Sequence, residues 1–350
     1  MTDTLLRVLS NADLDWMIAC GDRQTLAAGQ NLLHSSIAAE RISLVIDGTV
    51  GESFAIPGST VDEAVLIDEL SQGNMVGIGP LLDAPSRTSV KALKPTLILS
   101  LPIAQVTAKL AEDIAFAAHF YHAIALLLSD RLRRILERPD RIRLWGKQSD
   151  NDVLTVFGEL RDSDIDWVTA FGQVETVPAD RVLLPAARPV EALYILLDGQ
   201  MAVSALPASV NLLALCFLGL TNSAGDQSAC ATFSQGSMPG MMAFLDYRPL
   251  PVTVRSLTEC LVFAVPRQTL ATKLQVDDSF ASRFYRVIAM QIMARLQTVS
   301  MCLVEPTVPG VTPGLAMDDA ELDMADLQQV SEGAKKFGWM LSQLGVNHRG

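Results

Sequence analysis

The chain has 350 residues, of which 49% are hydrophobic and 19% are charged, and its formal net charge is −12. The length suggests about two domains, and the composition excludes a largely disordered chain. The acidic balance argues against nucleic acid as a partner, because an acidic chain gains nothing from the counterion release that drives such binding.

The five cysteines form no CxxC pair, which favours free thiols over a disulfide framework or a zinc site. The first ten residues contain no apolar stretch typical of a signal peptide. The longest apolar run, residues 210–220, is shorter than the roughly 20 residues that cross a bilayer. We therefore expect a cytoplasmic protein without membrane insertion.

Taken in chain order, the first part of the sequence predicts a helix, several strands and a closing helix. Asp13 and Asp15 lie where the first helix begins, so we expect them to cap it rather than to act as an acid–base pair. The strand over 40–50 contains an Asp-Gly turn signal, and the strand over 96–102 ends at a proline. Residues 104–135 then show helical spacing.

The closing helix carries two further features. His119 and His122 lie one helical turn apart, but no third ligand is evident, so we expect no metal site. Residues 129–147 are the most basic segment of the chain. Because no helix-turn-helix follows, we interpret this segment as a solvated connecting helix and not as a nucleic-acid contact.

The same pattern recurs in the second half, which indicates a duplicated domain. The blocks keep their order, and their spacing changes only at loops; residues 9–33, 44–50, 71–77 and 101–132 recur as 160–184, 195–201, 234–240 and 265–296. The second copy has extra residues between Met201 and Ser234. We expect an α+β protein with two tandem antiparallel β-roll domains, jelly-roll-like double-stranded β-helices, each with flanking helices.

Each copy resembles a cyclic-nucleotide-binding domain, the fold of the catabolite activator protein and of the kinase A regulatory subunit. The resemblance rests on "LVIDGTV" and "VGIGPLLDAPSRTSVKAL" in copy one, and on "LLDGQM" and "PGMMAFLDYRPLPVTVRSL" in copy two. It predicts a first domain over 1–137, a linker over 138–155, a second domain over 156–303, and a Pro/Gly linker with a C-terminal helix over 304–350. The double-domain layout and the tail "FGWMLSQL" also resemble cyanobacterial proteins associated with bacteriocin-type peptide export.

The resemblance implies a cassette in which a short helix and an arginine hold the cyclic phosphate, while a glutamate accepts from the ribose 2′-hydroxyl. In copy one Ile78 replaces the glutamate, and Pro80 removes one backbone donor. Counting forward from Gly77 places Arg87 at the arginine position. Counting backward from the strand that begins at Thr88 places Ser86 there instead. The degenerate cassette of copy one therefore comprises Gly77, Ile78, Gly79, Ser86, Arg87 and Thr88.

Copy two aligns with the family's cassette without a gap. Both positions that carry a charged residue in the family are apolar here. Met241 stands at the glutamate position and Leu250 at the arginine position, while Arg248 and Arg255 match neither. The degenerate cassette of copy two comprises Gly240, Met241, Met242, Ala243, Leu250 and Pro251.

The tail begins with a proline-glycine linker over 305–314, and an amphipathic helix is predicted after it. Its apolar positions are spaced alternately by three and four residues, as in one buried seam: Leu327, Val330, Ala334, Phe337, Leu341 and Leu344. Leu327, Phe337, Leu341 and Leu344 are the expected contact residues of this partner helix. The seam is open to docking on its own chain, to pairing with a second chain, or to binding another protein.

Two functions remain open. The loss of both charged contacts favours a non-catalytic regulatory or adaptor protein that acts through protein contacts and needs no cofactor, linked by resemblance to peptide export. The alternative is a sensor of cAMP or cGMP that relays binding to a partner protein. A DNA-binding regulator is less favoured, because only a linker and one acidic helix are predicted after Thr298. No nucleophile, metal or phosphate-loop motif supports an enzyme.

Overall fold

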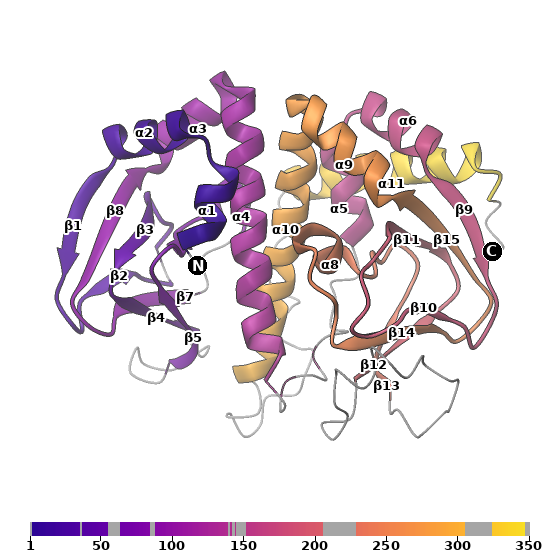
Figure 1. Cartoon of the computed structure of the whole chain (residues 1–350), viewed down its shortest axis with the longest axis horizontal. Helices are drawn as coiled ribbons and strands as arrows, with labels where there is room; N and C mark the ends of the chain where they lie inside the picture. Colours follow the sequence, from indigo (N-terminus) through magenta and orange to yellow (C-terminus); the bar gives the residue numbers. More distant parts are fainter. Residues whose placement is uncertain are drawn as a thin grey trace. The chain divides into compact units, whose positions relative to one another are not determined.

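The computed structural model describes residues 2–35, 37–54, 64–84, 88–138, 141, 144, 152–205, 229–304 and 324–346. By its contacts the chain divides into two units (Figure 1). Unit 1 comprises Met1–Ile135 and Ala281–Ala320, and unit 2 comprises Leu136–Phe280 and Glu321–Gly350. These units are defined by contacts, whereas the domain boundaries given above follow the sequence repeat and stay a prediction.

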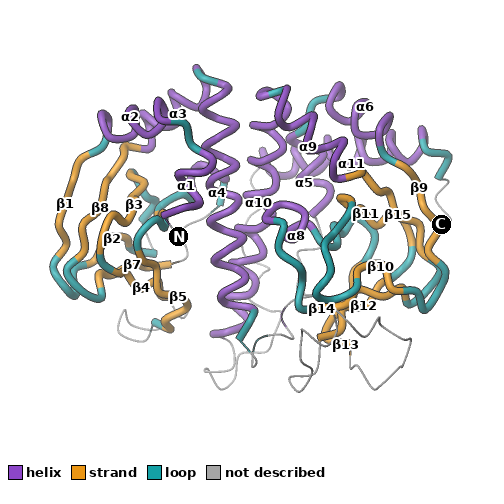
Figure 2. Tube along the Cα trace, in the orientation of Figure 1, coloured by secondary structure: helices purple, strands orange, loops and turns teal. Residues whose placement is uncertain are grey.

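Unit 1 consists of helices around two antiparallel sheets (Figure 2). The sheets have the strand orders β1-β8-β3-β6 and β2-β7-β4-β5. The strands are β1 (Asp22–Leu26), β2 (Asn31–Leu33), β3 (Arg41–Asp47), β4 (Thr49–Phe54), β5 (Val65–Ser71), β6 (Met75–Val76), β7 (Thr88–Ala92) and β8 (Thr96–Pro102). The helices are α1 (Thr2–Val8), α2 (Asn11–Cys20), the short 3-10 helix η2 (Gly79–Leu82), α3 (Ile103–Glu112), α4 (Ile114–Leu136) and most of α10 (Asp278–Val304).

The core of unit 1 lies between the two sheets. One cluster joins strands of both sheets through side chains that are almost fully buried: Val45, Val50, Leu70, Val76 and Val90. The predicted Asp-Gly turn joins β3 to β4, and Gly48 there has a φ of 101°. A Cβ at this position would lie 2.5 Å from Thr96 Oγ1, so only glycine fits the turn.

Unit 2 repeats this arrangement. Its sheets have the orders β11-β15-β9 and β10-β14-β12-β13. The strands are β9 (Gln173–Val177), β10 (Val182–Leu184), β11 (Ala192–Asp198), β12 (Met201–Ala205), β13 (Ala229–Phe233), β14 (Val252–Ser256) and β15 (Cys260–Pro266). The helices are α5 (Asp152–Glu159), α6 (Asp162–Phe171), α8 (Met241–Asp246), α9 (Arg267–Val276) and α11 (Met324–Gln343).

The strands of the two repeats pair in the same way: β8 lies between β1 and β3, as β15 lies between β9 and β11. Likewise β4 pairs with β5 and β7, as β12 pairs with β13 and β14. All of these pairs are antiparallel. The predicted α+β class and the antiparallel rolls are therefore confirmed.

The helix ends differ in detail from the prediction. Ser10, not an aspartate, is the N-cap of α2, and Asp13 completes a capping box by accepting from the Ser10 N–H at 2.7 Å. The segment 104–135 is two helices rather than one, because Asp113 interrupts it. The Asp113 carboxylate accepts from the Phe116 N–H at 3.0 Å and pairs with Lys109 at 2.8 Å. Asp277 does the same for Phe280 and Lys273 in the second repeat.

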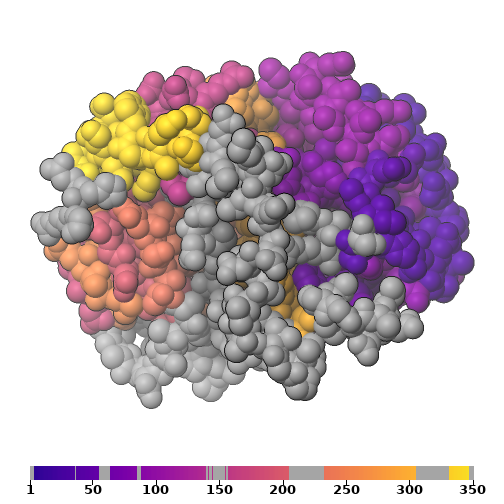
Figure 3. Space-filling model, turned by 180° about the vertical axis from the view of Figure 1, so that it is seen from behind, coloured from indigo at the N-terminus to yellow at the C-terminus, as the bar shows by residue number. Residues whose placement is uncertain are grey.

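Helix α11 packs on α5 and lies on the surface of unit 2 (Figure 3, yellow). The Phe337 ring lies 5.6 Å from that of Phe157, and Lys336 donates to the carbonyl oxygen of Leu160 at 2.7 Å. Phe337 and Leu341 are buried as the seam predicts, and Leu344 is half-buried in the turn after the helix. The Leu327 side chain lies outside the described residues. These contacts place the described part of the seam on its own chain.

The buried face of α11 is rotated slightly from the predicted seam. Ala334 is exposed, whereas Gly333 and Met340 are buried. A Cβ on Gly333 would lie 1.8 Å from the carbonyl oxygen of Leu154, so the close approach of α11 to α5 depends on this glycine.

We predict opposite effects for alanine at the two glycines of α11. Gly333→Ala should destabilise unit 2 by about 1–3 kcal/mol, because the helices must move apart. Gly338→Ala should stabilise it by up to about 1 kcal/mol, because a Cβ there meets nothing within 4 Å and alanine favours the helix. Urea unfolding of the two variants measures both effects, and equal effects of the same sign would contradict the packing.

Helix α10 is, among the described residues, the one helix long and apolar enough to cross a membrane. Of its most apolar window, 56% is buried inside the protein. A buried core helix meets the same criteria, so this is weak evidence for a membrane span.

Candidate functional site

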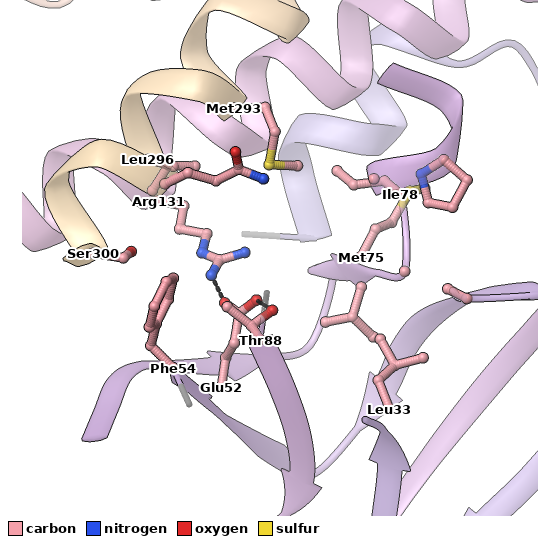
Figure 4. A pocket seen from close by; sticks show the side chains of 16 residues that line it. Leu33, Glu52, Phe54, Met75, Ile78, Thr88, Arg131, Met293, Leu296 and Ser300 are labelled. Carbon is pink, nitrogen blue, oxygen red and sulfur yellow. Dashed lines mark hydrogen bonds and ion pairs between the residues drawn. The ribbon is translucent and has the colours of Figure 1, made fainter. Parts of the chain in front are cut away.

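The cassette of the first repeat forms one wall of a cavity in unit 1 (Figure 4). The cavity has a volume of about 70 Å³. Strands β4 and β7, helix α4 and helix α10 supply the other walls. Its apolar side chains include Leu33, Phe54, Met75, Ile78, Met293 and Leu296, and its polar ones are Glu52, Thr88, Arg131, Gln297 and Ser300.

An ion pair occupies the centre of the polar wall. Arg131 reaches from α4 toward β4, and its Nη2 pairs with Glu52 Oε2 (Figure 4). The hydroxyl of Thr88 donates to Glu52 Oε1 at 2.6 Å. The exposed fractions of the Arg131 and Glu52 side chains are 12% and 8%. Glu52 Oε2 and Arg131 Nε have no hydrogen bond with any described residue. The ion pair therefore offsets most of the free-energy cost of removing these two charged groups from water.

A second carboxylate lies beside Glu52. Asp68 on β5 is directly opposite Glu52 on β4, and two like charges in such a pair repel each other. Arg131 relieves this repulsion, because its Nε lies 3.6 Å from Asp68 Oδ2. Arg134 adds a contact to the same oxygen at 3.0 Å and pairs with Asp130 at 2.5 Å.

The local electrostatics follow from burial. Burial raises the pKa of Asp68, although the Arg134 guanidinium acts in the opposite direction. Burial, followed by the positive charge of Arg134, lowers the pKa of Arg131 to about 10, so this guanidinium stays protonated at neutral pH. Three carboxylates (Glu52, Asp68 and Asp130) face two guanidinium groups (Arg131 and Arg134).

The structure brings part of the predicted first cassette to this cavity. Gly77, Ile78, Gly79 and Thr88 line it, and Gly77 has a φ of 79°. Ser86 and Arg87 lie outside the described residues, so their proposed phosphate contact stays a prediction. At the end of η2, Asp83 accepts from Arg286 of α10 at 2.5 Å, which holds the described part of the cassette against α10.

The second cassette is apolar throughout its described part. Met241, Met242, Ala243 and Leu250 are buried, Pro251 is half-buried, and Gly240 has a φ of 83°. The valine Val203 stands at the position of Glu52, and its cross-strand neighbour Ala231 stands at that of Asp68. Val252 stands at the position of Thr88, because it opposes Ala205 as Thr88 opposes Phe54.

The arginines near the second cassette have other partners. Arg248 pairs with Asp246 at 3.2 Å, and Arg255 pairs with Asp180 at 2.9 Å. Arg267 at the start of α9 donates to the carbonyl oxygens of Phe244 at 2.8 Å and Ala243 at 3.0 Å. It thereby supplies partners for carbonyl groups at the C-terminal end of α8, a contact that no local sequence pattern predicts.

The two histidines of α4 also have contacts. His119 Nδ1 lies 2.9 Å from Asp13 Oδ2, and the His122 ring stacks on that of Tyr285 with centroids 4.0 Å apart. Burial, followed by the neighbouring His119, lowers the pKa of His122 to about 4. His122 is therefore neutral near pH 7 and packs as an aromatic ring.

One protein family matches part of the second repeat. Residues 174–277 match the model of the cyclic nucleotide-binding domain. This range runs from β9 to α9 and includes the strands of both sheets and the second cassette. The match supports the cyclic-nucleotide-binding resemblance of this repeat. No curated protein is significantly similar to the chain.

Several solved structures are similar to the chain at low identity. The cAMP-bound PfPKA-R (141–441) is 12% identical, with coverage of 99% of this chain and 88% of that one and a TM-score of 0.32. The Thermus thermophilus catabolite activator protein is 18% identical over 50% of this chain and 75% of that one, with a TM-score of 0.33. The N-terminal domain of a Streptomyces coelicolor A3(2) transcriptional regulator is 21% identical over 39% of this chain and 92% of that one, with a TM-score of 0.31. These low values assign no ligand to the chain.

The residues that matter most in the first cavity were not predicted. Glu52, Asp68 and Arg131 come from three elements and meet only in the fold. One signal was available in the sequence: Glu52 shares a face of β4 with the buried Val50 and Phe54. A charged residue on an inward strand face requires a partner, although the sequence does not say which one.

Proposed function

We propose that the chain is a non-catalytic, cytoplasmic regulatory protein that acts through protein contacts, that its second repeat does not bind cAMP or cGMP, and that its first repeat binds them weakly at best. The match of residues 174–277 to the cyclic nucleotide-binding domain supports the regulatory part of this proposal. The observation that carries the finer proposal is the Glu52–Arg131 ion pair inside the cavity beside the first cassette.

Size and charge both argue against a cyclic nucleotide in this cavity. Small-molecule sites usually have volumes of roughly 300–1,000 Å³, and this cavity has about 70 Å³. A cyclic phosphate would also approach the carboxylate of Glu52, whose guanidinium partner already sits in place. A buried anion needs cationic or N–H partners to offset its desolvation, and this wall offers it a competing carboxylate.

The second cassette lacks the charged side chains that would bind a cyclic nucleotide. Met241 and Leu250 are buried at the positions that the family resemblance gives to a glutamate and an arginine. Hydrogen bonds to charged groups contribute about 1.5–3 kcal/mol each. Losing both contacts should remove about 3–6 kcal/mol, or on the order of a hundred- to ten-thousand-fold in affinity.

Calorimetric titration of the full chain with cAMP and with cGMP tests the proposal. We expect no binding tighter than about 10 μM, which corresponds to roughly −7 kcal/mol. Tighter binding would contradict it. In that case Arg87→Ala and Arg248→Ala assign the site, because loss of binding in the first variant points to the first cassette and loss in the second points to the second.

The alternative function is a cyclic-nucleotide sensor that relays binding to a partner. The family match over 174–277 favours it for the second repeat. Tight binding in the titration above would establish this alternative.

A role beside a bacteriocin-type peptide exporter rests only on the resemblance of the double-domain layout and the tail. Deleting the gene should then reduce peptide secretion, and unchanged secretion would remove this part of the proposal.

A further inference from the structure

The cavity of unit 1 is lined by the carboxylate of Glu52, and a second carboxylate, Asp68, lies opposite Glu52 on the neighbouring strand. We propose that the cavity is a binding site for a planar cation of the guanidinium class and that Arg131 occupies it as an internal ligand. The proposal rests on the proposed function, in which this cavity does not take a cyclic phosphate.

The carboxylates require a cation. Glu52 and Asp68 are directly opposite each other on β4 and β5, and the exposed fractions of their side chains are only 8% and 12%. Two buried carboxylates this close repel each other unless a positive charge lies between them. Arg131 supplies that charge through Nη2 toward Glu52 and Nε toward Asp68.

The geometry suits a guanidinium group better than an ammonium group. A guanidinium is a planar fork whose N–H groups point in several fixed directions, whereas an ammonium is a compact, strongly hydrated point charge. Here two nitrogens of one guanidinium, Nη2 and Nε, lie near two different carboxylates. The apolar walls, which include Phe54 and Leu296, also favour the more weakly hydrated cation.

Thr88 fixes the orientation of the acceptor. Its hydroxyl donates to Glu52 Oε1 at 2.6 Å, which leaves Oε2 to face the guanidinium. The second repeat has Val203, Ala231 and Val252 at the three corresponding positions, so the site belongs to the first repeat.

A ligand of this class competes with Arg131 for the same carboxylates. Since Arg131 is part of α4, its displacement changes a contact that holds α4 to β4 and β5. Binding of a guanidinium ligand is therefore linked to the position of α4.

Removal of Arg131 opens the site to an external ligand. We expect methylguanidinium to raise the Tm of full-length Arg131→Ala by roughly 2–6 °C at about ten times its Kd. Methylammonium at the same ionic strength should give no comparable rise. The matched control is Glu52→Gln/Arg131→Ala, which keeps the space but lacks one carboxylate, and its Tm should not respond. N-acetyl-arginine amide in place of methylguanidinium tests whether an arginine side chain of a peptide is also accepted.

No rise in Arg131→Ala, or an equal rise in the double variant, would overturn the proposal. If Arg131→Ala does not fold, the soluble yield on refolding from urea replaces the Tm. A higher yield with methylguanidinium than with methylammonium supports the site, and equal yields overturn it. Nucleotide binding by the wild type would instead contradict the proposed function, so the two failures are distinguishable.

Discussion

Replacing Arg131 by methionine should lower the free energy of unfolding by about 3–5 kcal/mol, the range found when one partner of a buried ion pair is removed. The aliphatic part of the side chain is kept, so most packing is retained. Glu52 then loses its cation opposite Asp68, whereas Asp68 keeps its contact with Arg134. Scanning calorimetry measures the loss. Lys91→Met is the control, because Lys91 is exposed on β7 and its replacement should change stability by less than about 0.5 kcal/mol.

A second substitution separates charge repulsion from lost packing. Adding Glu52→Leu to Arg131→Met removes one of the two carboxylates, and we expect the double variant to be more stable than Arg131→Met alone. Apolar groups of similar size can often replace a buried ion pair without lowering the stability of the protein. If the two substitutions destabilise the protein additively, Glu52 and Arg131 are not coupled, and the cavity is not organised by their ion pair.

Replacing both Phe337 and Leu341 by serine should release α11 from unit 2. Each side chain is buried, and each substitution should remove about 1.5–3 kcal/mol of stabilisation from burial, or about 3–6 kcal/mol together. Phe157 would lose the ring that packs against it. The free energy of unfolding and the hydrogen exchange of α5 report the change.

The control for this double variant is Trp339→Ser on the same helix. The Trp339 side chain is 42% exposed, so its loss should have a much smaller effect on stability. An unchanged Tm, oligomeric state and set of co-purified proteins for the double variant would mean that the seam has no role. A new partner or a new dimer in that variant would show that the docked face also serves contacts between chains.

Most of the fold could be predicted because its signals are local. Gly48 ends a strand at a turn that only glycine fits, and Pro102 and Pro266 mark the ends of β8 and β15. Repetition of these signals in the same order indicated two copies of one fold. The interruption of the long helices at Asp113 and Asp277 was missed, because apolar spacing continues through a break that a single capping side chain creates.

The candidate site could be predicted only in part. The glycines and apolar residues of the cassettes are contiguous in the sequence, and their spacing locates them. The Glu52–Arg131 pair joins a strand to a helix far along the chain, and no local pattern specifies such a pairing. Likewise, Gly333 rather than Ala334 faces α5, because the close contact with Leu154 depends on a surface that the helix pattern alone does not describe.

We propose that Arg131, and not a cyclic phosphate, occupies the cavity of the first repeat. Arginine-selective NMR of the guanidinium groups, recorded with and without cAMP, tests it most directly. We predict a signal that exchanges slowly with water, is absent in Arg131→Lys, shifts in Glu52→Gln and does not change when cAMP is added. A rapidly exchanging Arg131 signal, or one that moves as cAMP saturates the protein, would contradict the claim.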